Sequence, residues 1–266
     1  MIRRAALILL SLGASLFARQ EASSKPLRVL FIGNSYTYYN NLPRLLEVVA
    51  ESQKGGPRIE TGASLSGGKN LMWHWEKGEA LELIRKGGWD FVVLQEHSTL
   101  GKVPAQGAEP EINDPATYFE YAAKFHEEIV KAGARTVLYA SWARSGFPEH
   151  QRRLDDAFIR FALKSGAGIV PAGLAWTVAR IEVPAIVLHS PDRSHPTMAG
   201  SYLNALVFYQ SLTGRRASDP PSVISGPKQP GDARQVTLVN LPWSDANALN
   251  QIAQRVVAQE PLRPVR

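Results

Sequence analysis

Ser35 stands directly after a run of hydrophobic residues, in the stretch RVLFIGNSYTYYNN at positions 28–41. The hydrophobic run is typical of a buried β-strand, and Gly33 and Asn34 indicate a turn directly after it. A hydroxyl presented on such a turn has the geometry that the nucleophile of an acyl transfer needs. Gly, Asn and Ser are also the ordinary residues of turns, so this stretch alone leaves both interpretations open.

A serine nucleophile needs a base, and the segment HSPDRSHP at positions 189–196 contains a candidate for one. Asp192 precedes His195 by three residues in a loop bounded by prolines, just before a helix that we expect to begin near Pro196. A carboxylate at this spacing can reach the imidazole in a compact turn. It would then fix the tautomer and stabilise the imidazolium that forms when Ser35 loses its proton.

Two other interpretations of the same segment remain. Asp192 or Ser194 could cap the following helix, and His189, Asp192 and His195 could together bind a metal ion. The metal site is the weaker alternative, because the three side chains would need one helical face and the flanking prolines disfavour a helix there. We expect the remaining histidines to be packing or surface residues: His74, His97, His126 and His150.

The combination of these motifs resembles the SGNH hydrolase family, which is also called the GDSL-type esterases and lipases. FIGNS matches the family's first block at Gly33, Asn34 and Ser35, and DRSH matches its last block at Asp192 and His195. The resemblance covers residues 27–213 and is typical of a divergent, secreted bacterial branch. It implies a catalytic triad of Ser35, Asp192 and His195 and requires neither a metal ion nor an organic cofactor.

The resemblance also implies donors that hold the negative oxygen of the tetrahedral intermediate. The backbone N–H groups of Ser35 and Gly67 are the first candidates, with Gly68 second, because ASLSGGKN has the small, glycine-containing character of the family's second block. The third block departs from the family pattern of Gly-x-Asn-Asp and reads VVLQEHS. Gln95 stands near the place of the family's asparagine, and its amide is the third expected donor.

The substrate expected from these features is a small-molecule or carbohydrate ester, and short acyl groups such as acetyl on a glycan are our first choice. Asn34, Tyr36, Trp73 and Trp142 are candidate substrate contacts, although for each tryptophan taken singly a core position is the stronger expectation. The same triad would also serve a lipase or a thioesterase. The alternative from another class is a non-catalytic glycan-binding protein on a hydrolase scaffold.

The elements that would position these residues alternate along the chain. Strands are expected at 27–33, 58–64, 89–95, 135–142 and 167–173, and helices at 42–52, 70–87, 117–133 and 149–165. Strands that are hydrophobic throughout are typical of a parallel sheet covered by helices on both faces. We therefore predict an α/β/α sandwich, and the family resemblance implies a flavodoxin-like sheet of five parallel strands in the order 2-1-3-4-5.

The ends of the chain have a different character. Residues 1–22 predict a signal peptide, because Arg3 and Arg4 precede a short hydrophobic run and small residues follow it. This indicates an exported protein, periplasmic or extracellular, without a stable membrane anchor. Residues 27–213 are the expected catalytic domain, and residues 214–266 a connector followed by a helix at 244–259 that packs on the same domain.

Composition excludes several other classes. Hydrophobic residues form 44% of the 266-residue chain and charged residues 20%, as in an ordinary folded domain, and no cysteine is present to form a disulfide. The net charge of +6 is spread over the chain without a long Lys/Arg block, which argues against nucleic-acid binding. The long Gly/Pro-rich loop at 96–116 is a candidate substrate-contacting segment.

Overall fold

The computed structural model describes residues 25–101 and 111–259 of the chain. The predicted signal peptide, the middle of the 96–116 loop and the last seven residues lie outside the described residues. Five parallel strands form the central sheet: β1 (Leu27–Gly33), β2 (Ile59–Leu65), β3 (Phe91–Leu94), β4 (Arg135–Tyr139) and β5 (Gly168–Val170). Their order is β2-β1-β3-β4-β5, so the predicted fold class and strand order are confirmed.

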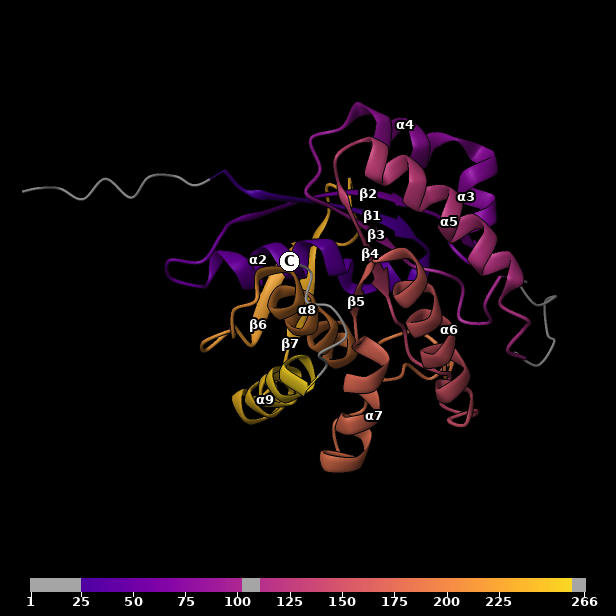
Figure 1. The fold of residues 1–266 in the computed structure, drawn as a ribbon. Coiled ribbons are helices and arrows are strands. Elements are labelled where there is room, and N and C mark those ends of the chain that lie inside the picture. The colour runs from indigo at the N-terminus through magenta and orange to yellow at the C-terminus, as the bar shows by residue number, and fades with distance from the viewer. Residues whose placement is uncertain (1–24, 102–110, 260–266) are drawn as a thin grey trace, which may run out of the picture.

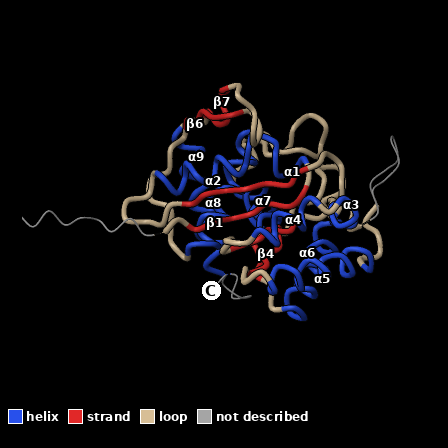
Figure 2. Tube along the Cα trace, turned by 90° about the horizontal axis from the view of Figure 1, so that it is seen from above, coloured by secondary structure: helices blue, strands red, loops and turns tan. Residues whose placement is uncertain are grey.

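Helices cover both faces of this sheet. One face packs against α3 (Leu71–Lys77), α4 (Glu79–Lys86), α5 (Ala116–Lys131) and α6 (His150–Ser165). The other face packs against α2 (Leu42–Glu51), α7 (Ala172–Glu182) and α8 (Met198–Thr213). Figures 1 and 2 show the strands between these two groups of helices. Alternate residues of β1 divide between the two cores, with Phe31 in one and Ile32 in the other.

The C-terminal part adds a further layer. The strands β6 (Val223–Pro227) and β7 (Gln235–Asn240) form an antiparallel pair, and α9 (Trp243–Gln259) follows them. Buried residues of all three elements join the core cluster that contains α2 and α8. None of the helices in the described part is long and apolar enough to cross a membrane.

The structure corrects three of the expected elements. The helix expected at 70–87 is two helices, because Gly78 adopts φ 80° and ends α3 in the left-handed conformation. The connector expected between residue 213 and the helix at 244–259 contains the β6–β7 hairpin. Helix α7, which the sequence pattern did not indicate, follows β5 directly through Pro171.

Candidate active site

Ser35 lies at the carboxyl end of β1, as the first residue of the short helix α1 (Ser35–Tyr38). Asn34 caps this helix, since its side-chain oxygen accepts the Tyr36 backbone N–H at 3.1 Å. The amide of Asn34 also donates to the Lys69 carbonyl at 2.9 Å, which ties the turn to the segment after β2. The two hydrogen bonds of the Asn34 side chain therefore fix the turn after β1, and this turn carries Ser35.

Gly33 permits a close approach between this turn and the end of β3. A Cβ atom at position 33 would lie 2.6 Å from Oε1 of Gln95, so a larger residue has no space there. The same Oε1 accepts hydrogen bonds from the Asn34 backbone N–H at 2.7 Å and from the Thr37 hydroxyl at 3.3 Å. Gln95 thus holds the Asn34 backbone before Ser35 and the Thr37 side chain after it.

The loop between α7 and α8 carries His195 to this end of the sheet. The Ser190 N–H donates to the His195 carbonyl at 2.8 Å, and the Trp142 indole N–H donates to the Ser194 carbonyl at 3.0 Å. Arg193, in the same loop, adopts φ 63°, which is uncommon for a residue with a side chain. This tight turn directs the imidazole toward Ser35.

Asp192, His195 and Ser35 form one line of hydrogen bonds. The Nε2 atom of His195 lies 2.7 Å from the Ser35 Oγ, and its Nδ1 atom lies 2.6 Å from Oδ2 of Asp192. The other carboxylate oxygen of Asp192 accepts the backbone N–H groups of Ser194 and His195, each at 2.9 Å. The structure therefore brings together the three residues that the two motifs single out.

The ionised form of Asp192 is favoured by these contacts. Burial raises the pKa of Asp192, but the hydrogen bonds from the His195 ring and from the two backbone N–H groups outweigh burial and leave this pKa below its usual range. A carboxylate that stays ionised keeps the histidine in the tautomer whose Nε2 accepts a proton from the serine. The arrangement can deprotonate Ser35 as it attacks a carbonyl carbon.

The backbone N–H groups of Ser35 and Gly67 have no hydrogen-bond partner within residues 25–101 and 111–259, and Gly67 is exposed beyond the end of β2. A Cβ atom at position 67 would lie 2.7 Å from the Tyr38 hydroxyl, so glycine permits Tyr38 to approach this backbone closely. Gly68, the second candidate, adopts φ 66°.

The geometry does not support Gln95 as the third oxyanion donor. Its side-chain oxygen is engaged with Asn34 and Thr37, its amide N–H donates to the Glu96 carbonyl, and only 1% of the residue is exposed. The amide is therefore part of the support beneath the serine turn. The sequence shows that an amide stands at this place in the chain, but not which groups it contacts.

Three of the four expected substrate contacts are buried. Asn34, Tyr36 and Trp142 are 2%, 4% and 1% exposed, so they have almost no surface for a substrate. Tyr36 stacks on Trp142 with ring centroids 4.5 Å apart, and Trp142 stacks on Trp176 at 3.9 Å. This aromatic column supports the His195 loop, and the Tyr36 hydroxyl lies 2.8 Å from the Ser194 Oγ.

Trp73, the fourth expected contact, is half-buried on α3. The ammonium groups of Lys69 and Lys77 each lie 5.6 Å from the centre of its ring. Part of its surface is accessible, unlike that of Trp142.

The metal-site alternative is not supported. No group of three or more His, Cys, Asp or Glu side chains in the described part of the chain could hold a metal ion. His189 contacts the Ala143 carbonyl through Nε2 at 3.0 Å, whereas Asp192 and His195 bind each other.

The segment after β3 contains two buried ionisable residues that the motifs did not identify. Burial raises the pKa of Glu96 to about 7, although backbone N–H groups of His97, Leu71 and Gly101 donate to its carboxyl group. Burial and the nearby Arg144 lower the pKa of His97 to about 4. The Glu96 carboxyl group thus connects the start of α3 to residues 97–101, directly after Gln95 in the chain.

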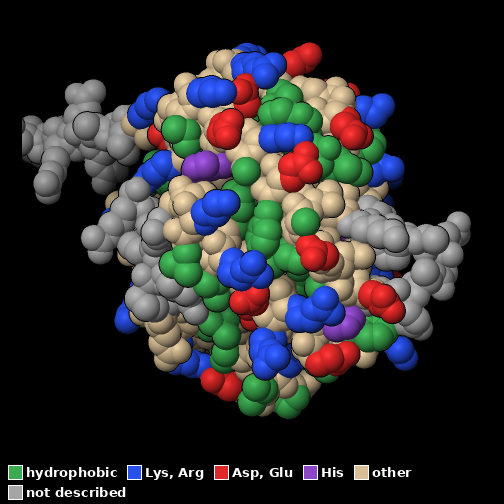
Figure 3. Space-filling view, turned by 45° about the vertical axis from the view of Figure 1, so that its right-hand side comes forward, with side chains coloured by type: hydrophobic (Ala, Val, Ile, Leu, Met, Phe, Trp, Pro, Cys, Tyr) green, Lys and Arg blue, Asp and Glu red, His purple; other side chains and the backbone are tan. Residues whose placement is uncertain are grey.

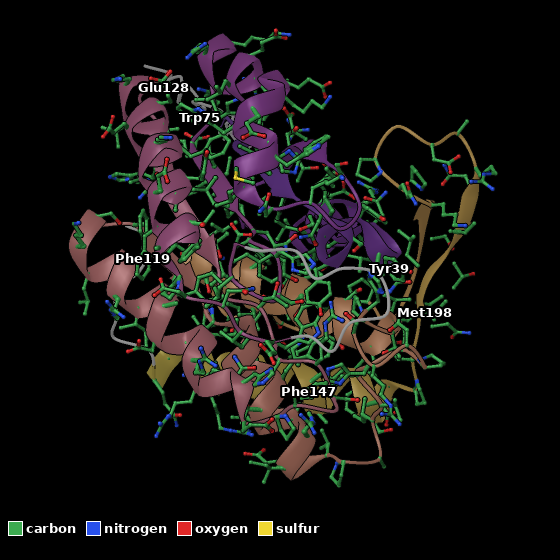
Figure 4. The ribbon with its side chains drawn as sticks, turned by 90° about the vertical axis from the view of Figure 1, so that its right-hand side faces the viewer. Tyr39, Trp75, Phe119, Glu128, Phe147 and Met198 are labelled. Atoms are coloured by element: carbon green, nitrogen blue, oxygen red, sulfur yellow. The ribbon has the colours of Figure 1, made fainter. Side chains whose placement is uncertain are left out.

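Tyr39 is a further residue of the site for which the motifs gave no specific role. Its ring is stacked on the His195 imidazole with centroids 4.1 Å apart. Figure 4 shows it on the same side of the molecule as Met198, which begins α8.

The strand order and a serine, histidine and aspartate at the carboxyl ends of the strands define a three-layer α/β protein with a hydrolase-like site. No family model and no curated protein sequence matches the chain. A protein from Slackia heliotrinireducens that is assigned to the SGNH hydrolases is 27% identical, with a TM-score of 0.57 over 72% of this chain and 100% of its own.

Two more distant structures share the fold. A lipase/acylhydrolase from Enterococcus faecalis is 14% identical, with a TM-score of 0.57 over 71% of this chain and 96% of its own. An acetyl-xylooligosaccharide esterase from Geobacillus is 14% identical, with a TM-score of 0.52 over 69% of this chain and 93% of its own. These structures share the fold of this chain, and the similarity to the Slackia protein supports the resemblance to the SGNH hydrolase superfamily.

Proposed function

We propose that the protein is a serine esterase in which Ser35 is the nucleophile, His195 the general base and acid, and Asp192 the residue that orients His195. The observation that carries this proposal is the hydrogen-bonded line from the Asp192 carboxylate through the imidazole to the Ser35 hydroxyl. The similarity to solved structures of SGNH hydrolases and esterases supports ester hydrolysis in general. A glycan-binding protein without turnover would not need the three groups in this arrangement.

The reaction follows from the proton path. The Ser35 Oγ attacks the ester carbonyl carbon while Nε2 of His195 takes its proton, and the N–H groups of Ser35 and Gly67 donate to the resulting oxyanion. The alcohol leaves with the proton from His195, and the acyl group stays on Ser35 as an ester. Water then attacks this acyl-enzyme, its proton goes to His195 and on to Ser35, and the free acid leaves.

We propose short acyl groups, acetyl above all, on a carbohydrate as the substrate class. Half-buried aromatic rings of Tyr38 and Trp73 are available to stack on sugar rings, and the Geobacillus neighbour is an acetyl-xylooligosaccharide esterase. The signal peptide predicted at 1–22 from the sequence favours export to the compartments where such polymers are found. On the face that Figure 3 shows, basic side chains are interspersed with acidic ones, unlike a continuous nucleic-acid-binding surface.

A chain-length series tests the substrate proposal. The purified protein is assayed with p-nitrophenyl acetate, butyrate, octanoate and palmitate, and with acetylated and deacetylated oligosaccharides for release of acetate. We expect kcat/KM to fall steeply beyond butyrate and acetate to be released from the acetylated sugars. Highest activity on palmitate would instead identify a lipase, and the Ser35→Ala variant supplies the background rate for every substrate.

A further inference from the structure

The His195 imidazole is enclosed by two tyrosines. The Tyr39 ring lies almost parallel to it, with centroids 4.1 Å apart and an angle of 11° between the planes. Tyr36 meets the imidazole edge-on, with centroids 5.7 Å apart and an angle of 73°. Only 23% of the histidine side chain is exposed. Together with the bonds to Asp192 and Ser35, these rings leave the imidazole little freedom to rotate.

The backbone after Tyr39 is held in an unfavourable conformation. Asn40 and Asn41 have φ angles of 51° and 49°, and such left-handed residues other than glycine persist only where surrounding contacts hold them. The Asn40 amide donates to the Ser201 Oγ at 3.0 Å and, more weakly, to the Pro196 carbonyl at 3.4 Å. The Asn41 amide donates to the Pro227 carbonyl at 2.8 Å.

These contacts attach the Tyr39 segment to the histidine loop itself. Pro196 directly follows His195, and Ser201, on the first turns of α8, donates in turn to the Tyr39 carbonyl at 3.3 Å. Tyr39 and His195 are thus fixed to the same part of the molecule. The backbone segments that carry the two rings are therefore held next to each other.

We propose that Tyr39 is a positioning residue for His195: its ring holds the imidazole on the line between Asp192 and Ser35 and stabilises the imidazolium during acyl transfer. The inference rests on the proposed function, because it assigns a role within that reaction. An aromatic face attracts a cation that lies over it, so the contact strengthens when His195 takes the proton of Ser35. Stabilisation that grows toward the transition state raises kcat more than it lowers KM.

The ionisable groups that face the imidazole in the described part are few. Asp192 belongs to the same loop, and Tyr36 and Tyr39 come from the segment after β1. Burial raises the pKa values of both tyrosines, with a further contribution from the charge of Asp192, so both rings stay neutral where the enzyme would work. A change at Tyr39 therefore acts on His195 through ring contact and not through a lost charge.

The test compares three variants of the full protein. Tyr39→Leu fills much of the same space without an aromatic face, Tyr39→Phe keeps the face without the hydroxyl, and Tyr121→Leu makes the same change on the half-buried surface of α5. We expect Tyr39→Leu to lower kcat roughly threefold to tenfold with KM changed less than about twofold. The acid limb of its kcat/KM profile moves about half a pH unit lower, because a less stabilised imidazolium loses its proton sooner.

We expect Tyr39→Phe to recover most of the kcat that Tyr39→Leu loses, and Tyr121→Leu to keep the wild-type kcat and pH profile. A Tyr39→Leu enzyme with unchanged kcat and profile would overturn the inference, and a change confined to KM would make Tyr39 a wall of the substrate site instead. Active-site titration with a fluorophosphonate corrects for misfolded protein, and Tyr39→Met is a second variant if the leucine enzyme does not fold.

If the wild-type enzyme hydrolyses no ester, the proposed function fails. The imidazole proton shifts in NMR spectra of wild type, Tyr39→Phe and Tyr39→Leu then test the stack alone: equal shifts in all three would overturn it.

Discussion

Nε2 of His195 and Oγ of Ser35 lie 2.7 Å apart although 160 residues separate them in the chain. Contacts from several parts of the fold hold the two atoms at this distance. Gln95 and Asn34 hold the serine turn, and the aromatic column beneath Tyr36 holds the histidine loop. Because each support can be changed separately, the proposed mechanism makes several separate predictions.

Replacement of Asp192 by asparagine should lower kcat on p-nitrophenyl acetate by on the order of a hundredfold or more, because the amide cannot stabilise the imidazolium and can favour the wrong tautomer. The substituted side chain retains an oxygen for the two backbone N–H groups that Oδ1 of Asp192 accepts, so the turn should persist. Steady-state kinetics beside thermal unfolding check both statements. Unchanged kcat in a folded Asp192→Asn enzyme would remove Asp192 from the mechanism.

The role of Gly67 as an oxyanion donor can be tested with a substitution at Gly67 and a second substitution, at Tyr38, that should restore activity. The Cβ of a Gly67→Ala variant would meet the Tyr38 hydroxyl at 2.7 Å, while the next nearest atom of that ring is 3.8 Å away. The displaced N–H should cost about tenfold or more in kcat, as loss of an oxyanion donor does elsewhere. Adding Tyr38→Phe removes the clash, so the double variant should recover activity relative to Gly67→Ala. Failure to recover, with Tyr38→Phe alone active, would contradict this account of the site.

Gln95 should matter for stability through the Asn34 backbone. A Gln95→Leu variant leaves the buried Asn34 N–H without its acceptor, which should reduce the free energy of unfolding by about 1–3 kcal/mol. Urea denaturation of wild type and variant measures this difference. A variant of wild-type stability would show that Gln95 does not support the serine turn.

Glu96 should make stability depend on pH. Its pKa of about 7 lies above the ordinary value of 4.5, so the folded protein binds its proton more tightly than the unfolded chain does. The stabilisation from Glu96 is complete below about pH 4.5 and is lost as pH rises through 7. Over this interval the free energy of unfolding of wild type should fall relative to Glu96→Gln by roughly 3 kcal/mol at most.

The neighbouring His97 has the opposite effect. Its pKa of about 4 lies below the ordinary 6.5, so its contribution is complete above about pH 6.5 and is lost as pH falls toward 4. His97 is common to wild type and Glu96→Gln, and the difference between their unfolding curves at pH 4.5, 5.5, 6.5 and 7.5 isolates Glu96. A difference that is constant over these four values would contradict the raised pKa of Glu96.

The sheet and the pairing of Asp192 with His195 could be predicted because their signals are local. Hydrophobic strands bounded by turn residues identify a parallel sheet, and a spacing of three residues lets a carboxylate reach an imidazole within one turn. Other elements lack such signals. Helix α7 is apolar on most sides and therefore lacks a clear helical period. The β6–β7 hairpin contains Pro227 and is buried by tertiary contacts that include α2 and α8.

The contacts of individual side chains could not be predicted, because they depend on residues far apart in the sequence. The sequence places an amide at Gln95 and indoles at Trp142 and Trp176, but the fold determines that the amide supports Asn34 and that the indoles stack. The same holds for Tyr39, whose ring reaches a histidine on another loop. The local sequence pattern predicts where a strand begins and ends. The contacts of these side chains can be assigned only from the tertiary structure.

The most direct test of the central claim is the rate of p-nitrophenyl acetate hydrolysis by wild type and by Ser35→Ala, with fluorophosphonate labelling followed by peptide mass spectrometry. We predict that wild type turns over the ester, that Ser35→Ala loses this activity to near the uncatalysed rate, and that the label is found on Ser35. Equal rates for the two folded proteins, or a label on another residue, would contradict the assignment of Ser35 as the nucleophile.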